Sequence, residues 1–202
     1  TFRGRGLQRP QRPEAITVVG AGLAGAAVAR ELADSGLPVT VLEAAAEPAT
    51  GASGIPATVM HPRLHHDGSD GATLKAIAYA HAIAATRRMV EWGDSGLVRT
   101  GALQIPSPNF PVERLEAVAE RYARTGLGVE LVNRQAALEL AGAQALALPD
   151  RALWFPDACT VDTPRLTRCL LEHPDIEVRA LTLEIGWPET PTILACGMGA
   201  RD

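Results

Sequence analysis

The stretch "ITVVGAGLAGAAVARELADSGLPVTVLEA", residues 16–44, contains the pattern that decides the fold of this chain. It begins with a β-branched apolar run, Ile16 to Val19, which is typical of a strand buried on both faces. Three glycines follow at once in G-x-G-x-x-G order, at Gly20, Gly22 and Gly25. In a dinucleotide-binding turn these glycines permit the tight bend, the approach of a pyrophosphate, and close packing of a helix on the strand.

The rest of the stretch supplies the other parts of such a motif. Residues 23–35 predict an alanine-rich helix, and Gly36 predicts its C-terminal stop. The N-terminus of that helix would offer unpaired N–H groups to phosphates. Residues 39–42 predict a second strand, which Glu43 ends 21 residues after Gly22. A carboxylate at that distance is suited to accept ribose hydroxyls. The order of these parts favours a dinucleotide site over a purely structural glycine turn.

The size and charge of the chain exclude some classes of protein. The 202 residues, 47% of them hydrophobic, are enough for one substantial domain or two small ones with a real core. The net charge of −4 gives no basic footprint for nucleic acid, so an RNA partner would have to bind local patches or parts outside this chain. No apolar run reaches transmembrane length and no secretory signal is visible, so we expect a cytoplasmic protein.

Cysteine and histidine give no sign of a metal site. Cys159, Cys169 and Cys196 are odd in number and lack C-x-x-C spacing, so we expect structural thiols in a reducing compartment. His65 and His66 are adjacent in a polar segment, which is typical of a solvated loop rather than of a zinc site.

The two ends of the chain indicate that it is part of something longer. The chain opens with Thr1, and residues 1–13 carry four arginines, two prolines and no acid, which predicts a linker over residues 1–14. A basic arm that contacts RNA is the alternative. At the other end the sequence stops five residues after Gly197, with no closing element.

Between the ends, helices and strands are expected to alternate. Ser53 lies between Gly51 and Gly54 in an expected loop, where small residues would let a flat ligand approach the backbone. We expect helices at 72–92, 112–125 and 164–172, a helical turn at 135–140, and strands at 97–105 (with a break at Gly101), 129–132, 176–183 and 192–196.

Taken together, these landmarks resemble the FAD-dependent amine oxidase family that includes D-amino acid oxidase, glycine oxidase and sarcosine oxidase. The matching pieces are VVGAGLAGAAVARELADSG with Glu43, GASG at 51–54, RTGALQI at 99–105, the Val161-Asp162-x-Pro164 turn, and ILACG at 193–197. Within the family, GASGIPATVMHPRL at 51–64 is similar to the branch formed by the FAD-dependent oxidoreductase domains of bifunctional tRNA 5-methylaminomethyl-2-thiouridine biosynthesis proteins.

The chain also departs from the pattern of that branch. Ile55 stands where the branch usually has Asn, and Cys159 and Thr160 replace a glycine and a bulky residue. The segment between Val178 and Ile193 is shorter than the β-meander of such enzymes. We therefore expect weak or absent FAD retention, and no amine oxidation, from these residues alone.

The resemblance implies an α/β fold, with a Rossmann-like FAD/NAD(P)-binding domain and part of an α+β substrate domain. It implies a discontinuous FAD-binding domain over residues 15–80 and 155–202, with the partial substrate domain at 81–154. It also implies FAD as the cofactor, no metal, and a set of cofactor-binding residues. These are Gly20, Ala21, Gly22, Leu23, Ala24, Gly25, Glu43, Ala44, Ala52, Ser53, Gly54, Ala180, Ala195, Cys196 and Gly197.

The chemistry that the resemblance implies is oxidation of a C–N bond by hydride transfer to the flavin. In the tRNA branch, the carboxymethylaminomethyl group of a wobble uridine would become aminomethyl with release of glyoxylate, beside a fused methyltransferase domain. Arg63 and Arg99 are candidates to hold the substrate carboxylate, although a plain surface arginine is the favoured interpretation of either residue. No catalytic residue is assigned. A free amino-acid or glycine oxidase and an inactive FAD-binding module remain the alternatives.

Overall fold

The computed structural model describes residues 12–62, 64–91, 95–142, 149–181 and 188–197. The chain forms two compact units, which are described separately: unit 1 comprises residues 1–56 and 163–202, and unit 2 residues 57–162. Residues 57–80 and 155–162, which the sequence placed in the nucleotide-binding domain, therefore group with unit 2. The domain boundaries drawn from the sequence remain a proposal. Most of the expected linker, and residue 63, lie outside the described residues.

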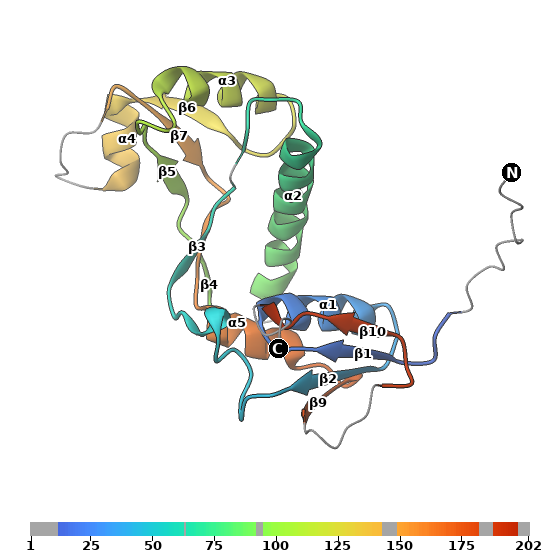
Figure 1. The fold of residues 1–202 in the computed structure, drawn as a ribbon. Coiled ribbons are helices and arrows are strands. Elements are labelled where there is room, and N and C mark those ends of the chain that lie inside the picture. The colour runs from blue at the N-terminus through green and yellow to red at the C-terminus, as the bar shows by residue number, and fades with distance from the viewer. Residues whose placement is uncertain (1–11, 63, 92–94, 143–148, 182–187, 198–202) are drawn as a thin grey trace, which may run out of the picture. The chain divides into compact units, whose positions relative to one another are not determined.

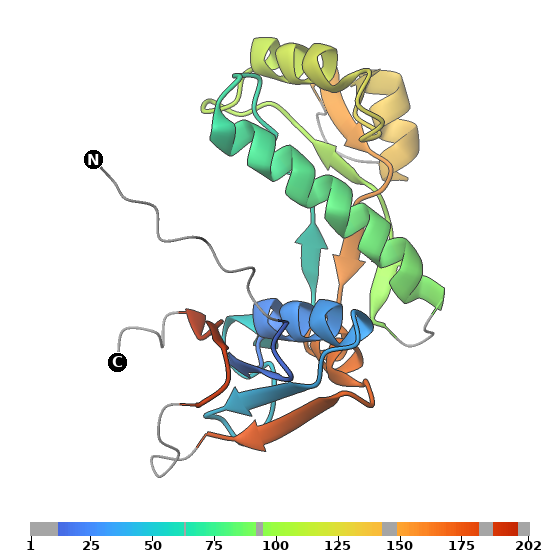
Figure 2. The same cartoon turned by 90° about the vertical axis from the view of Figure 1, so that its right-hand side faces the viewer.

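Unit 1 is built on a four-stranded parallel sheet in the order β10-β1-β2-β9 (Figure 1). The strands are β1 Ile16–Val19, β2 Val39–Glu43, β9 Ile176–Ala180 and β10 Thr192–Leu194. Val18 pairs with Val41 and Ile193, and both Val18 and Val41 are fully buried. Two helices, α1 Leu23–Asp34 and α5 Thr163–Leu171, pack against each other on one face of this sheet (Figure 2). This is the expected Rossmann-like arrangement, and the α/β fold class is confirmed.

Helix α1 packs closely because the residues on its buried face are small. Ala26, Ala29 and Ala33 are spaced by three and four residues and are almost completely buried. The helix ends as the sequence predicted, at a left-handed Gly36 with φ of +79°. The N–H of Gly36 donates to Ala33, and that of Leu37 donates to Leu32, which is the Schellman arrangement.

The described residues of unit 2 form two three-stranded antiparallel sheets and three helices. One sheet has the order β3-β8-β4, and the other β5-β7-β6. Its strands are β3 Thr58–Met60, β4 Leu97–Arg99, β5 Ala102–Gln104, β6 Glu130–Asn133, β7 Arg151–Phe155 and β8 Cys159–Val161, and its helices are α2 Asp70–Glu91, α3 Val112–Tyr122 and α4 Arg134–Ala141. A 3-10 turn in unit 1, η1 Ala52–Gly54, completes the elements.

A hydrophobic core holds unit 2 together. Amphipathic α3 buries Leu115, Val118 and Tyr122, again with helical spacing, and β7 buries Leu153 and Phe155 against them. The ring of His61 meets Phe155 edge to face, at 4.7 Å between centroids. Within the described residues, no helix combines the length and the apolar character that crossing a bilayer would require.

The break expected at Gly101 divides one predicted strand into two, because β4 and β5 belong to different sheets. Gly101 has φ of +68°, and a Cβ at this position would collide with the ring of Trp154. Three strands were not predicted: β3 lies in an expected loop, and β7 and β8 correspond to no expected strand. All three are defined by antiparallel pairing between segments distant in the sequence: β8 pairs with β3 and β4, and β7 pairs with β5 and β6.

Candidate functional site

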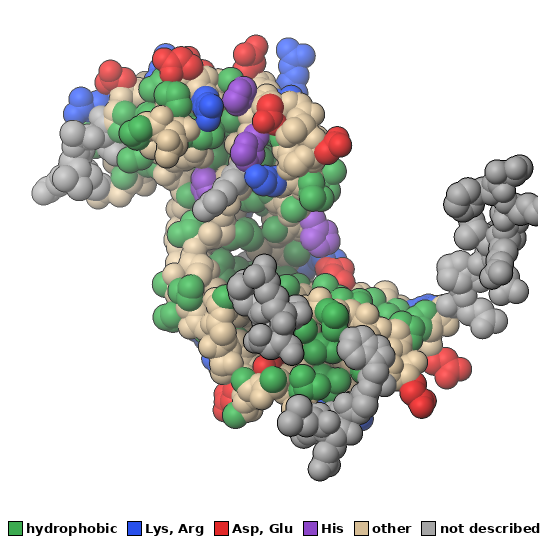
Figure 3. Space-filling view, in the orientation of Figure 1, with side chains coloured by type: hydrophobic (Ala, Val, Ile, Leu, Met, Phe, Trp, Pro, Cys, Tyr) green, Lys and Arg blue, Asp and Glu red, His purple; other side chains and the backbone are tan. Residues whose placement is uncertain are grey.

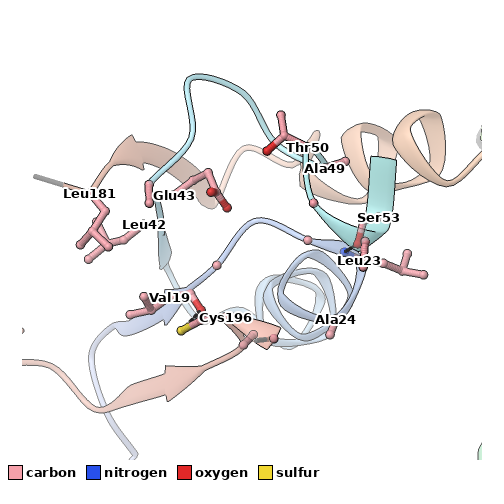
Figure 4. Close-up of a pocket in the computed structure, with 17 residues that line it drawn as sticks. Val19, Leu23, Ala24, Leu42, Glu43, Ala49, Thr50, Ser53, Leu181 and Cys196 are labelled. Carbon is pink, nitrogen blue, oxygen red and sulfur yellow. Dashed lines mark hydrogen bonds between the residues drawn. The ribbon is translucent and has the colours of Figure 1, made fainter. Parts of the chain in front are cut away.

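The carboxyl ends of β1, β2 and β10 open onto a pocket of about 660 Å³ that belongs entirely to unit 1 (Figure 4). Ligands of open α/β sheets bind at this end of the strands. The pocket is lined by Val19, Gly20, Gly22, Leu23, Ala24, Leu42, Glu43, Ala44, Ala49, Thr50, Gly51, Ala52, Ser53, Leu181, Ala195, Cys196 and Gly197. Eleven of the residues chosen from the sequence are among them.

Two of the three glycines permit close backbone packing. Gly20 has φ of +106°, and a Cβ there would lie 2.6 Å from the carbonyl oxygen of Ala195 on the neighbouring segment. A Cβ at Gly25 would collide with the carbonyl oxygen of Gly20. Only glycine fits at either position, so β1, β10 and α1 can meet at the turn.

The third glycine keeps the N-terminus of α1 open to the pocket. Gly22 is the N-cap residue, and it supplies no side chain to bond the first helical N–H groups. Instead, the Leu23 N–H donates to the Ser53 hydroxyl, at 2.9 Å between nitrogen and oxygen. A Cβ on Gly22 would lie 3.1 Å from that hydroxyl oxygen. The first turn of α1 holds no acidic residue, so its positive dipole end is available to an anion.

Glu43 is held in place by the backbone on both sides of its carboxylate. Oε2 accepts the Ala21 N–H at 2.6 Å, and Oε1 accepts the Ala45 N–H at 2.9 Å. Each carboxylate oxygen can accept a further hydrogen bond, so a pair of hydroxyl groups could still be bound. The carboxylate therefore has a fixed position between the two ends of the pocket (Figure 4).

The two ends of the pocket differ in character. Leu42 and Leu181 lie at one end, and Ser53 and the start of α1 lie at the other (Figure 4). The N–H of Leu181 donates to the carbonyl of Glu43 at 2.7 Å, which places this leucine beside β2. From one end of the pocket to the other, the lining presents an apolar wall, then a carboxylate, and then a helix N-terminus. It fits an adenine ring, a ribose and a diphosphate, the three parts of an adenosine diphosphate group.

Four residues that were predicted to bind the cofactor do not line the pocket, and each has a structural role near it. Ala21 donates its N–H to Glu43, and Gly25 allows α1 to approach the turn. Gly54 leaves room for the carbonyl of Ala49, which a Cβ would approach to 3.0 Å. Ala180 pairs with Glu43 across β2 and β9.

Six lining residues were missed: Val19, Leu42, Ala49, Thr50, Gly51 and Leu181. Val19 and Leu42 end the two predicted strands and could have been chosen on that basis. Ala49 is a buried residue with a left-handed φ of 60°, and no sequence pattern predicts that conformation for an alanine.

The two arginines proposed for a substrate carboxylate have different outcomes. Arg63 lies outside the described residues. Arg99 belongs to β4 of unit 2, where its guanidinium forms an ion pair with Asp157. Its assignment to a substrate remains a proposal.

The cysteines are free thiols, and none of them forms a disulfide. Cys196 lines the pocket with its Sγ 3.5 Å from the carbonyl oxygen of Val19. Burial raises the pKa of the Cys159 thiol, so it stays protonated at neutral pH. In the part of the chain that the structure describes, no cluster of His, Cys, Asp and Glu could hold a metal ion.

Comparison with known proteins gives a family and a set of relatives. The DAO family model, described as FAD dependent oxidoreductase, matches residues 15–175. The chain is 35% identical over 177 residues to the tRNA 5-methylaminomethyl-2-thiouridine biosynthesis bifunctional protein MnmC of Chromobacterium violaceum, covering 86% of this chain and 26% of that protein. It is 42% identical over 167 residues to the MnmC protein of Thiobacillus denitrificans, covering 81% and 26% respectively. The chain thus spans about a quarter of the length of these relatives.

Solved structures share the fold at lower identity. Glycine oxidase from Bacillus cereus superposes with a TM-score of 0.62 at 17% identity, covering 88% of this chain and 50% of that one. Glycine oxidase from Geobacillus kaustophilus gives 0.61 at 23% identity, covering 85% and 47%. At these identities the likeness shows the fold alone.

Proposed function

Because the chain belongs to the FAD dependent oxidoreductase family, we propose that the pocket of unit 1 binds the adenosine diphosphate half of FAD. One observation carries the proposal: a fixed carboxylate, Glu43, and an uncapped helix N-terminus at Gly22 line the same pocket. These groups match a ribose and a diphosphate in chemistry and in order.

Each group in the pocket would have a defined role. The backbone N–H groups at the start of α1 would donate to the diphosphate oxygens. The Ser53 hydroxyl already accepts the Leu23 N–H, and it would donate its own hydrogen to the same anion. Glu43 would accept the ribose hydroxyls, and Leu42 and Leu181 would cover the adenine ring. FAD, when bound, would accept a hydride from the carbon bonded to an amine nitrogen, so that the C–N bond could become an imine.

We further propose that a protein containing this chain acts in tRNA wobble-uridine modification. The support is the similarity to MnmC proteins, 35% and 42% identical to this chain in two species, which are named as tRNA 5-methylaminomethyl-2-thiouridine biosynthesis bifunctional proteins. Two-electron oxidation of the C–N bond in a carboxymethylaminomethyl group gives an imine. Water then hydrolyses the imine to glyoxylate and an aminomethyl group, which a fused methyltransferase domain could methylate.

The charge distribution bears on how tRNA would be bound. The net charge is −4, and on the face drawn in Figure 3 the described Lys and Arg side chains are interspersed with Asp and Glu. Since phosphate backbones are held by clustered positive charge, most of the tRNA contacts would come from other parts of the full-length protein. A free amino-acid oxidase is the second candidate, because it would use the same nucleotide pocket.

The deciding experiment uses a full-length relative that contains this pocket. The relative is assayed for glyoxylate release from tRNA bearing carboxymethylaminomethyl-uridine and, separately, from free glycine. We expect much faster release from the tRNA. Faster turnover of free glycine would assign the protein to the amino-acid oxidases, and no turnover of either by a FAD-loaded protein would favour an inactive module.

A further inference from the structure

A second pocket, of about 390 Å³, lies in unit 2, and the flavin proposal does not use it. Its walls come from the end of α2, from β4, and from the turn between β7 and β8. They comprise Ile83, Thr86, Arg87, Leu97, Val98, Arg99, Asp157 and Cys159. The volume is within the range of small-molecule sites, which is about 300–1,000 Å³.

One carboxylate in this pocket lies within ion-pair distance of two guanidinium groups. Arg99 forms an ion pair with Oδ1 of Asp157, and Nη2 of Arg87 lies 3.7 Å from the same oxygen. The Asp157 side chain is 12% exposed, whereas those of Arg87 and Arg99 are 68% and 57% exposed. Two positive charges against one negative charge leave these three residues with a net charge of +1.

The backbone turn that carries Asp157 is held by local contacts. The Ala158 N–H donates to the carbonyl of Phe155, and the thiol of Cys159 lies 3.5 Å from the carbonyl oxygen of Asp157. The charge of Asp157 therefore attracts both guanidinium groups to the pocket, while its Oδ1 has no hydrogen-bond partner in the described structure. Each guanidinium has five N–H groups and pairs with planar oxyanions in a forked geometry.

The other walls are mainly apolar. Ile83 is buried, Leu97 is half-buried, and Val98 remains 59% exposed. A dianion would leave charge uncompensated here and would gain nothing from these walls. A single negative charge attached to a short aliphatic group matches both the net charge and the apolar surface.

We propose that this pocket binds a small monocarboxylate, held by Arg87 and Arg99 with its aliphatic part against Ile83, Leu97 and Val98. Asp157 is a positioning residue, which orients the arginines. The proposal is independent of flavin binding, so it can be tested on the 202-residue chain without FAD.

The test follows the arginine Nε–H resonances of the ¹⁵N-labelled chain by NMR during titration with sodium formate, acetate, propionate and inorganic phosphate. Chloride keeps the ionic strength constant. We expect saturable shifts at Arg87 and Arg99 only, and tighter binding from formate to propionate, by up to about fourfold per added methylene. Shifts of equal size at all arginines, or tighter binding of phosphate than of propionate, would overturn the proposal.

The variants have a matched control. Arg99→Lys and Arg87→Lys keep the charge but lose the fork, and each should weaken propionate binding at least fivefold. Arg179 of unit 1 is also 57% exposed and also paired with a carboxylate, that of Glu177, so Arg179→Lys should bind propionate unchanged. If Arg99→Lys disturbs the fold, the more exposed Arg87→Lys provides the test alone. Unchanged affinity in a folded Arg87→Lys protein would contradict the assignment.

Discussion

The carboxylate of Glu43 and the backbone N–H of Ala21 are joined by a hydrogen bond of 2.6 Å between oxygen and nitrogen, although 22 residues separate them. This bond ties the end of β2 to the glycine turn that follows β1. It also fixes the one acidic side chain among the described residues that line the nucleotide pocket. The position of Glu43 is therefore determined before any ligand arrives.

Glu43→Arg should weaken FAD binding by more than tenfold, about 1.4 kcal/mol or more. The substitution removes the acceptor for the ribose hydroxyls and leaves the Ala21 and Ala45 N–H groups without their present partner. Fluorescence titration of FAD measures the change. Glu47→Arg is the control, because it makes the same charge change on an exposed residue that does not line the pocket. Equal FAD affinity in the Glu43 variant and the wild type would remove Glu43 from the site.

Gly22→Val and Gly25→Ala should fail in different ways. At Gly22 a Cβ meets only the Ser53 hydroxyl, at 3.1 Å, so the valine is expected to fill pyrophosphate space and abolish FAD binding while the fold survives. At Gly25 a Cβ collides with the Gly20 carbonyl, so even alanine should lower the free energy of unfolding, by about 1–3 kcal/mol. Thermal unfolding and FAD titration of both variants separate the effects. A Gly22→Val protein that retains FAD would place the phosphates elsewhere.

The stability of unit 2 should fall as the pH rises from 10 to 12. Burial raises the pKa of Tyr79 to about 12, with the Cys159 thiol adding to the rise and Arg99 opposing it. The unfolded chain loses this proton near pH 10, so the folded state binds more protons above that pH. The stabilisation is complete below pH 10 and is lost as the pH approaches 12, by roughly 2–3 kcal/mol. Denaturant unfolding across this range should show the loss in the wild type and a smaller one in Tyr79→Phe.

The chain's other tyrosine is a matched control at neutral pH. The Tyr79 hydroxyl is buried without a hydrogen-bond partner in the described structure, whereas the Tyr122 hydroxyl donates to the carbonyl of His65 at 3.1 Å. Tyr79→Phe should therefore leave stability unchanged or raise it. Tyr122→Phe should lower it by about 0.5–1.5 kcal/mol. A larger loss at Tyr79 than at Tyr122 would mean that its hydroxyl has a partner.

The sequence predicted the parts of the site that are local in the chain. The strand, the glycine turn, the helix and Glu43 lie within 28 residues, Ile16 to Glu43, and each has a steric or electrostatic reason that a pattern can display. Residues 52–54 and 195–197 were placed in the site by resemblance to a family, not by periodicity. Their proximity depends on Ser53 reaching Leu23 and on β10 pairing with β1, contacts between distant parts of the chain.

The remaining parts depend on tertiary structure. Strand β3 is only three residues long, and its pairing with β8 spans about 100 residues, so no local periodicity marks it. Ala49 lines the pocket in a left-handed conformation that alanine does not favour. The sequence did not predict a role for Asp157, because only the fold brings it close to Arg87 and Arg99.

The central claim, that the pocket of unit 1 holds an adenosine diphosphate group, is tested most directly by NMR titration of the ¹⁵N-labelled chain with ADP. The account predicts saturable amide shifts centred on Ala21 to Ala24, with further shifts at Ala45 and Ser53. Residues of the unit 2 core, such as Leu115 and Leu153, should not respond. Saturable binding that leaves the amides of Gly22 and Leu23 unshifted, or no binding at millimolar ADP, would contradict it.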